Sequence, residues 1–260
     1  MALDLLGIRV TVRATGAGAA SLEAAIRRAW DRCLASPSST PDIVLDVALD
    51  AGSAAGLIPG PAITGSDELL LMDLLASRLN LEALQARVGE LLLLHACAVA
   101  DPVSGATIVL VAPSGTGKTT AAVALGRRFG YLSDEIAAIR PDGRMLAYPK
   151  PLSVTVGGQR PKRQVSPSEL GLLGSPGEPW LAAIALLDRA PASGGPVVSQ
   201  VRTIEALPAL AAQSSSLHLL DKPLRLVAGM LQGTGGLRRI TYHSAEDLVP
   251  VVAEMMGQAS

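Results

Sequence analysis

Residues 112–120, with the sequence APSGTGKTT, constrain the fold of this chain more than any other stretch. They fit the phosphate-binding loop pattern, with Ala112 where the first glycine usually stands. Gly115 and Gly117 let the backbone curl until successive N–H groups point into one concavity, which suits an anion. A helix expected to begin near Lys118 adds the positive end of its dipole. The stretch therefore predicts a site for nucleotide phosphates.

Side-chain chemistry assigns roles within this loop. Lys118 can reach the β- and γ-phosphates of a nucleotide, and the hydroxyl of Thr119 can bind Mg²⁺. The expected nucleotide-binding residues are Pro113, Ser114, Gly115, Thr116, Gly117, Lys118, Thr119 and Thr120. The apolar run 106–111 predicts a buried strand before the loop, and residues 119–129 predict a helix after it. The loop alone leaves NTP hydrolysis, phosphoryl transfer and nucleotide-dependent switching open.

Composition excludes several classes of function. Aromatic residues make up 2% of the chain, so the core is expected to be aliphatic and few rings can stack on nucleic-acid bases. A net charge of −1 provides no field that would attract nucleic acid or an anionic membrane. Two cysteines, Cys33 and Cys97, form neither a disulfide framework nor a metal cluster.

The N-terminus and the apolar runs bear on localisation. The first residues lack a basic start and a long apolar stretch, so we expect no signal peptide. The longest apolar run, near residues 91–100, is too short to span a bilayer. We therefore expect a cytoplasmic protein with no nucleic-acid or membrane partner.

The first third of the chain has no motif that carries chemistry. Alternating residues predict strands at 5–14 and 43–49, and helical spacing predicts helices at 22–34 and 69–88, the second with a break at Asn80. We expect a small α+β domain over residues 1–90, followed by a second domain over 91–260. The first domain would bind a partner, shape the substrate site or only complete the fold.

A tight turn decides the kind of sheet that holds the loop. Residues 91–100, which include His95, predict a buried strand, and residues 101–105 predict a turn directly before the strand that leads into the loop. Two strands joined by so short a turn must be antiparallel, because a parallel crossover needs about a dozen residues or more. Ordinary P-loop NTPases enter the loop from a parallel sheet, so we expect a different, mixed sheet here.

An acidic pair, Asp134 and Glu135, lies in the strand predicted at 131–140. Adjacent side chains on a strand point to opposite faces, so both can face the nucleotide only if the strand bulges or ends there. One of the two would then bind the metal or act as the base, and the other would have a positioning role.

The remaining chain has weaker signals. Residues 157–179 predict a long mobile loop whose basic cluster is either solvated surface or a lid that closes on phosphate or substrate. Lys150 either contacts phosphate or ends a strand, and Lys150 and Arg163 are candidate substrate-binding residues. Strands are expected at 180–188, 197–203 and, as an edge strand, 237–242. Helices are expected from residue 204, over 219–232 and over 245–256.

The order of His95, the strand pair, the loop and the acidic pair resembles the HPr kinase/phosphorylase superfamily, which shares its nucleotide core with ATP-dependent phosphoenolpyruvate carboxykinase. The resemblance covers residues 91–156 well and the rest of the C-terminal region weakly. With Tyr148-Pro149-Lys150-Pro151, the chain looks most like the shorter HPr-kinase-like proteins. These include lasso-peptide kinases, which phosphorylate a serine of a precursor peptide. The resemblance implies an α/β fold, a phosphoenolpyruvate carboxykinase-like P-loop kinase core with a mixed sheet.

The resemblance also implies residue roles. His95 would lie near the transferred phosphate, Asp134 would act as base on the acceptor hydroxyl, and Lys118 would stabilise the charge of the transferring group. Thr119 and Glu135 would hold Mg²⁺. The family usually has Asp-Asp, so Glu135 departs from the pattern. The Arg-containing signature that is tied to phosphorolysis is not found, which argues against phosphorylase activity and against HPr as the substrate.

The expected function is that of an ATP-dependent, serine-type kinase. It would use ATP and Mg²⁺ to transfer the γ-phosphate to a hydroxyl of a peptide or protein substrate, such as a natural-product precursor peptide. Two alternatives stay open: a small-molecule kinase of the same fold, and a non-catalytic ATP-binding scaffold or sensor. A homo-oligomer is also left open, and His95 is alternatively a hydrogen-bonded core histidine.

Overall fold

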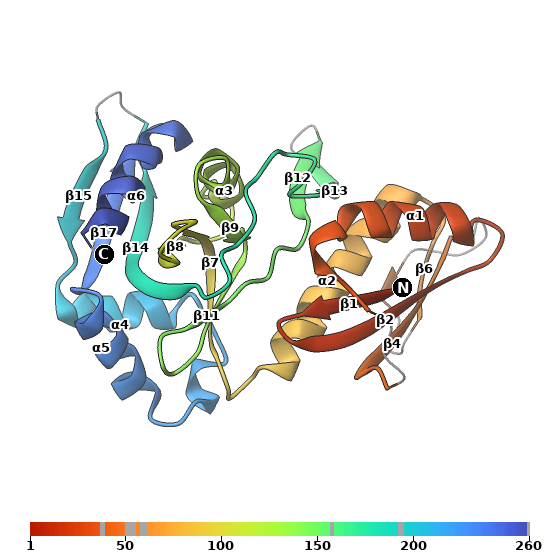
Figure 1. The fold of residues 1–260 in the computed structure, drawn as a ribbon, viewed down its shortest axis with the longest axis horizontal. Coiled ribbons are helices and arrows are strands. Elements are labelled where there is room, and N and C mark those ends of the chain that lie inside the picture. Colours follow the sequence, from red (N-terminus) through yellow and green to blue (C-terminus); the bar gives the residue numbers. More distant parts are fainter. Residues whose placement is uncertain (37–39, 50–55, 58–61, 157–158, 192–194, 259–260) are drawn as a thin grey trace. The chain divides into compact units, whose positions relative to one another are not determined.

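The computed structural model describes residues 1–36, 40–49, 56–57, 62–156, 159–191 and 195–258 (Figure 1). The chain forms two compact units, Met1–Ala86 with Lys150–Leu170 and Arg87–Pro149 with Gly171–Ser260. This division differs from the single boundary expected at residue 90, because residues 150–170 return to the first unit. Each unit is described by itself.

The first unit contains a six-stranded sheet in the order β3-β1-β2-β4-β6-β5. Its strands are β1 (Ala2–Leu5), β2 (Ile8–Thr15), β3 (Leu34–Ala35), β4 (Ile43–Leu49), β5 (Gly56–Leu57) and β6 (Ala62–Gly65). Where one strand was expected over 5–14, β1 and β2 form an antiparallel hairpin. Leu6 and Gly7 both have positive φ, 54° and 81°, as a tight two-residue hairpin turn requires.

Two helices pack on one face of this sheet, α1 (Ala19–Ala29) and α2 (Glu68–Ala86), with a short 3₁₀ helix η1 (Asp31–Cys33) after α1. Alternate residues Val10 and Val12 of β2 are buried, whereas Arg9 before them and Arg13 after them are partly or fully exposed. The break expected at Asn80 is wrong, since α2 continues through it. Buried residues on both sides of Asn80 stabilise the helix, and tertiary packing overrides a weak local preference.

The basic segment that was expected to be a long loop contains a strand. β13 (Gln159–Val165) pairs antiparallel with β12 (Leu152–Val156), while residues 157–158 lie outside the described residues. The Nε2–H of Gln164 donates to Asp73 Oδ1 at 3.4 Å, and the hydroxyl of Ser166 donates to Asp31 Oδ1 at 2.7 Å. These bonds attach the hairpin to the helices of the first unit, which explains why it belongs there.

The second unit contains a nine-stranded mixed sheet in the order β11-β10-β7-β8-β14-β17-β15, with β9 and β16 also paired to β7. The strands are β7 (Leu92–Ala100), β8 (Ala106–Val111), β9 (Gly130–Ser133), β10 (Ile136–Ile139), β11 (Met145–Leu146), β14 (Trp180–Arg189), β15 (Val197–Gln200), β16 (Ser214–Ser215) and β17 (Leu237–Tyr242). The helices are α3 (Lys118–Gly126), α4 (Thr203–Ala211), α5 (Pro223–Gly233) and α6 (Leu248–Gly257), with 3₁₀ helices η2 (Leu217–Leu219) and η3 (Ala245–Asp247).

This topology confirms the mixed α/β class. β7 and β8 are antiparallel, as the short turn predicted, whereas β8, β14 and β17 are parallel to one another. The strand expected at the sheet edge, β17, is internal, because β15 pairs with its other side. The sheet that leads into the loop is therefore antiparallel on one side of β8 and parallel on the other.

The two faces of this sheet have different partners. Along β7, every second residue from Leu92 to Ala100 joins a core that includes residues of α4 and α5. The alternate residues, among them His95 and Cys97, point to the opposite face. That face is the one on which α3 and α6 contact the sheet and each other. His95 and Cys97 therefore share a face with the helix that follows the loop.

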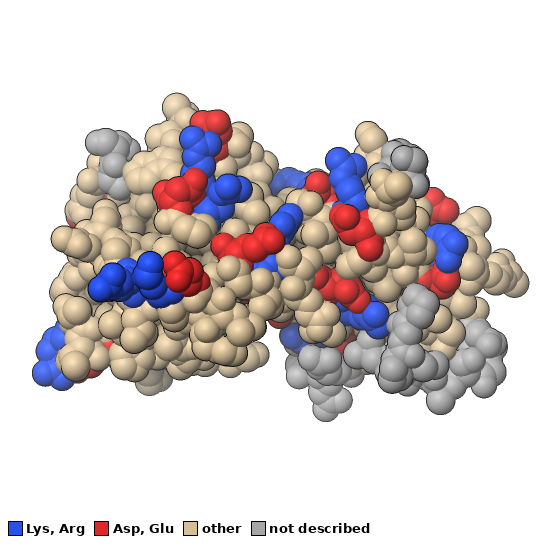
Figure 2. Space-filling model, turned by 90° about the horizontal axis from the view of Figure 1, so that it is seen from below, with Lys and Arg blue, Asp and Glu red and all other residues tan. Residues whose placement is uncertain are grey.

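Surface and helix properties bear on partners. No helix among the described residues is long and apolar enough to cross a membrane. On the face displayed in Figure 2, basic and acidic side chains are interspersed. Among the described side chains that this view shows, charges of one sign do not gather into an extended region.

The turn between β7 and β8 provides a test of the fold. Gly105 has φ 75°, and a Cβ there would lie 2.6 Å from the carbonyl oxygen of Glu178, whereas Gly143, with φ 84°, has no atom within 4 Å of a Cβ. Gly143→Ala is expected to destabilise by about 1–2 kcal/mol from backbone strain alone. Gly105→Ala should cost about 1–3 kcal/mol more, because the backbone must shift. Urea unfolding followed by circular dichroism measures both, and equal losses would contradict the close approach.

Candidate active site

The phosphate-binding loop leaves the sheet beside His95. On one side of β7, β8 pairs with residues 96–100 and its last pair joins Val111 to Ala96. On the same side, β16 pairs with Leu94 and Leu93. His95 lies between these two partners, and its backbone N–H donates to the carbonyl of Gln213 at 2.7 Å. The loop therefore begins next to His95, at the position where β16 takes the place of β8 as the neighbour of β7.

The acidic pair interrupts the strand on the other side of β7. β9 ends at Ser133 and β10 begins at Ile136, and both pair antiparallel with β7. The hydroxyl oxygen of Ser133 accepts the backbone N–H groups of Glu135 and Ile136, at 3.3 and 3.1 Å. Asp134 is 2% exposed and Glu135 is half-buried. The strand is therefore interrupted at the acidic pair. Such an interruption was expected if both side chains were to face the same side.

The loop has the backbone that its glycines predicted. Gly115 and Gly117 have φ of 83° and 97°, and Gly117 is the left-handed residue before α3, which begins at Lys118. The Nζ of Lys118 donates to the carbonyls of Ala112 and Pro113, at 2.7 and 2.9 Å. The ammonium group is thereby held over the loop by neutral acceptors.

One hydrogen bond joins the loop to the acidic pair. The hydroxyl of Thr119 donates to Asp134 Oδ2 at 3.0 Å, and the hydroxyl of Tyr131 donates to Asp134 Oδ1 at 3.3 Å. Thr119, the residue after the loop lysine, is thus in direct contact with Asp134, the first residue of the acidic pair.

The oxygen atoms at this contact suit Mg²⁺. The ion prefers oxygen ligands and is usually bound by one or two carboxylates together with substrate phosphates and water. Thr119 and Asp134 present a hydroxyl and a carboxylate side by side. Among the described residues, no group of three His, Cys, Asp or Glu could hold a metal on its own.

Burial favours the neutral forms of His95 and Cys97. Burial lowers the pKa of His95, and the positive charge of Lys118 lowers it further, while Glu135 and Asp134 act in the opposite direction. Burial raises the pKa of the Cys97 thiol to about 12, and the charge of Asp134 contributes. His95 is half-buried rather than a core residue, whereas Cys97 is fully buried, as expected of a small apolar side chain.

The site includes two tyrosines that the sequence did not indicate. Tyr131 contacts Asp134, and the hydroxyl of Tyr242 donates to the carbonyl of Thr116 at 3.3 Å. Burial raises the pKa of Tyr242. Tyr242 ends β17, which is parallel to β8 through β14, and ligands of such sheets bind at the carboxyl ends of parallel strands. Recognising these strands as parallel would have indicated Tyr242.

The two candidate substrate residues belong to the first unit. Lys150 is 2% exposed, and its Nζ donates to the carbonyl of Pro151 at 3.3 Å. Arg163 is exposed and forms an ion pair with Glu169 at 3.2 Å. The loop and the acidic pair belong to the second unit, so a role of Lys150 and Arg163 in substrate binding stays a prediction.

Comparison with known proteins adds no family assignment. No protein-family model matches the chain, and no curated protein matches it. The function proposed below is therefore supported by the geometry of the site and by the resemblance of its motifs.

Thiol labelling tests the burial of the site. Cys33 belongs to the first unit and Cys97 to the second, and burial raises both thiol pKa values to about 12. Since the thiolate is the reactive form, neither should react with iodoacetamide at pH ~7.5 until its unit unfolds. Mass spectrometry of labelled peptides across a urea series would report the unfolding of each unit. Rapid labelling of Cys97 in the native protein would contradict the buried site.

Proposed function

We propose that this protein is an ATP-dependent kinase that transfers the γ-phosphate to a hydroxyl, that of a serine in a peptide or protein. The observation that carries the proposal is the 3.0 Å hydrogen bond from Thr119 to Asp134, which joins a phosphate-binding loop to an acidic pair. P-loop phosphotransferases use this combination of a loop hydroxyl and a carboxylate to hold Mg²⁺. The resemblance to HPr-kinase-like proteins supports the same reaction.

The loop supplies the donor half of the site. Its N–H groups and the start of α3 bind the phosphates of ATP. Lys118 exchanges the carbonyls of Ala112 and Pro113 for phosphate oxygens, which are stronger acceptors because they are charged. Thr119 and Asp134 would hold Mg²⁺, and the ion would supply positive charge to the phosphates of the nucleotide. Phosphoryl transfer depends mainly on such positioning and charge stabilisation.

The contacts favour an exchange of the two roles that the resemblance implied for the acidic pair. Both carboxylate oxygens of Asp134 accept hydroxyl groups of the protein, and the side chain is almost fully buried. Glu135 is half-buried and lies beside the His95 ring, whose neutral form burial favours. A general base must reach the proton that it removes. We therefore propose that Asp134 serves the metal and that Glu135 is the base on the acceptor hydroxyl.

Transfer of labelled phosphate tests this function. The intact protein is incubated with γ-labelled ATP and Mg²⁺, with a library of serine-containing peptides in one arm and free serine and sugars in another. The proposal predicts a labelled peptide whose mass has increased by one phosphate. Labelling in the small-molecule arm alone would replace the peptide acceptor by a metabolite. Bound ATP with transfer to neither arm would indicate a scaffold or sensor instead.

A further inference from the structure

The first unit contains a cavity of about 420 Å³ between α1, the first turn of α2, and β13 with the turn after it. This volume falls within the range of about 300–1,000 Å³ that is typical of ligand sites. Ala25, Ala29 and Met72 provide an apolar part of its lining. The cavity is formed within one unit by three segments that are distant in sequence, so it is a property of the folded unit.

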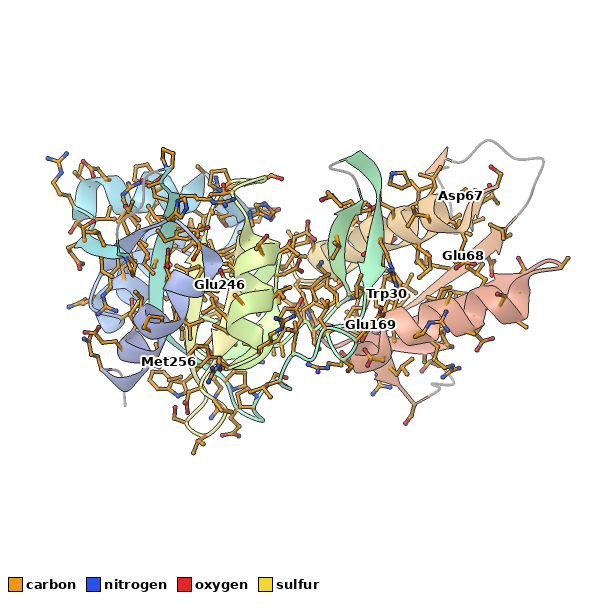
Figure 3. The ribbon with its side chains drawn as sticks, turned by 90° about the horizontal axis from the view of Figure 1, so that it is seen from above. Trp30, Asp67, Glu68, Glu169, Glu246 and Met256 are labelled. Atoms are coloured by element: carbon orange, nitrogen blue, oxygen red, sulfur yellow. The ribbon has the colours of Figure 1, made fainter. Side chains whose placement is uncertain are left out.

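Five charged residues line the cavity, and three of them have partners. Asp67 Oδ1 accepts the backbone N–H of Leu70 at 2.8 Å, and Arg163 pairs with Glu169 at 3.2 Å. Asp67 and Glu68 come from the start of α2, and Glu169 comes from the turn after β13 (Figure 3).

The other two lining charges, Arg28 and Glu68, are exposed. Among the residues that the structure describes, neither side chain has a hydrogen-bond or ion-pair partner. The cavity therefore presents one positive and one negative group that no described side chain neutralises.

This arrangement disfavours a phosphate-type ligand. The start of a long helix would favour an anion, but Asp67 and Glu68 already place negative charge there. Two arginines and three carboxylates also leave the lining with a net charge of −1 (2 − 3). The site instead suits a ligand that has charges of both signs and an apolar portion between them.

We propose that this cavity binds a short peptide segment with one acidic and one basic side chain. The Arg28 guanidinium would pair with the acidic side chain, in the two-pronged geometry that arginine and carboxylate favour. Glu68 would pair with the basic side chain, and the alanine and methionine surface would contact the aliphatic part of the segment. The inference rests on the proposed function: the segment belongs to the acceptor peptide, at a distance from its serine, and the first unit is the recognition unit of the kinase.

The probe is an equimolar library of N-acetylated, C-amidated tetrapeptides. Each peptide has one acidic and one basic residue, and all pairs of positions are represented. A second library has glutamine in place of both charged residues. The intact protein is incubated with each library, and retained peptides are measured by mass spectrometry after rapid gel filtration. The charged library should be retained at least ~10-fold better, as expected for about 1.4 kcal/mol of ion pairing. Free arginine and glutamate form a third arm.

Matched variants locate the binding. Arg28→Gln and Glu68→Gln each remove one of the two ion pairs and should each lower retention of the charged library about threefold, and the double variant should lower it to the level of the neutral library. Arg27→Gln and Glu23→Gln serve as controls, because these neighbours on α1 pair with each other at 3.0 Å, are exposed or partly exposed, and do not line the cavity. Trp30, buried directly after Ala29, gives a second readout by fluorescence in a Trp180→Phe background.

Three results would overturn the inference: equal retention of both libraries, equal effects of the cavity variants and the control variants, or retention of the free amino acids alone. Its failure differs from failure of the proposed function, because ATP binding and transfer are measured at the other unit. Loss of peptide retention with intact phosphoryl transfer removes only the recognition site. Retention of peptides without phosphoryl transfer to any acceptor would contradict the kinase activity and leave the peptide-binding cavity.

Discussion

Replacement of Lys118 by methionine is expected to lower the rate of phosphoryl transfer by about 10²–10³-fold and to weaken ATP binding. Lys118 is the buried cation of the loop, and its Nζ already lies within hydrogen-bond distance of two loop carbonyls. Methionine keeps most of the apolar stem but removes the charged donor that the transferring phosphate needs. Titration calorimetry with a non-hydrolysable ATP analogue and transfer of labelled phosphate measure the two effects separately.

Lys222→Met is the matched control, since Lys222 is an exposed lysine of the same unit that pairs with Asp221. It removes the same charge without touching the loop, so it should leave ATP affinity and transfer within about twofold of the wild type. Unchanged ATP affinity and transfer in Lys118→Met would show that residues 112–120 are an ordinary turn.

Replacement of Asp134 by asparagine is expected to reduce transfer by about 10³-fold at ordinary Mg²⁺ concentrations. Asparagine keeps the size of the side chain and an oxygen that can accept the Thr119 hydroxyl, but it loses the negative charge that holds the ion. The Mg²⁺ concentration for half-maximal transfer should therefore rise, while binding of metal-free ATP is kept. Initial rates over a Mg²⁺ series provide the measurement.

Glu135→Gln distinguishes the two carboxylates. If Glu135 is the base, this variant should lose about 10²–10⁴-fold in transfer with an unchanged Mg²⁺ requirement. The reverse pattern, an Mg²⁺ effect in Glu135→Gln and none in Asp134→Asn, would restore the roles that the family resemblance implied. Either way, the two variants together assign the acidic pair.

The loop and its flanking strands could be predicted because their signals are local. Gly115 and Gly117 require left-handed backbone whatever surrounds them, and the few residues between β7 and β8 permit only an antiparallel pair. These features depend on spacing within about twenty residues.

The features that could not be predicted depend on contacts between distant segments. Tyr242 reaches the carbonyl of Thr116, 126 positions away, only because β14 places β17 parallel to β8. The basic residues near Arg163 formed no helical or strand pattern strong enough to show that β13 pairs within the first unit. The choice between Asp134 and Glu135 likewise needed the contact with Thr119.

The central claim, that Thr119 and Asp134 form one Mg²⁺·ATP site, is tested most directly by a double-mutant cycle. ATP affinity with and without Mg²⁺ is measured by calorimetry for the wild type, Thr119→Ala, Asp134→Asn and the double variant. The site predicts that Mg²⁺ strengthens ATP binding in the wild type and that each single variant loses most of this gain. The double variant should lose little more, with a coupling of about 0.5–3 kcal/mol. Additive losses, or a wild type whose ATP affinity is indifferent to Mg²⁺, would contradict the claim.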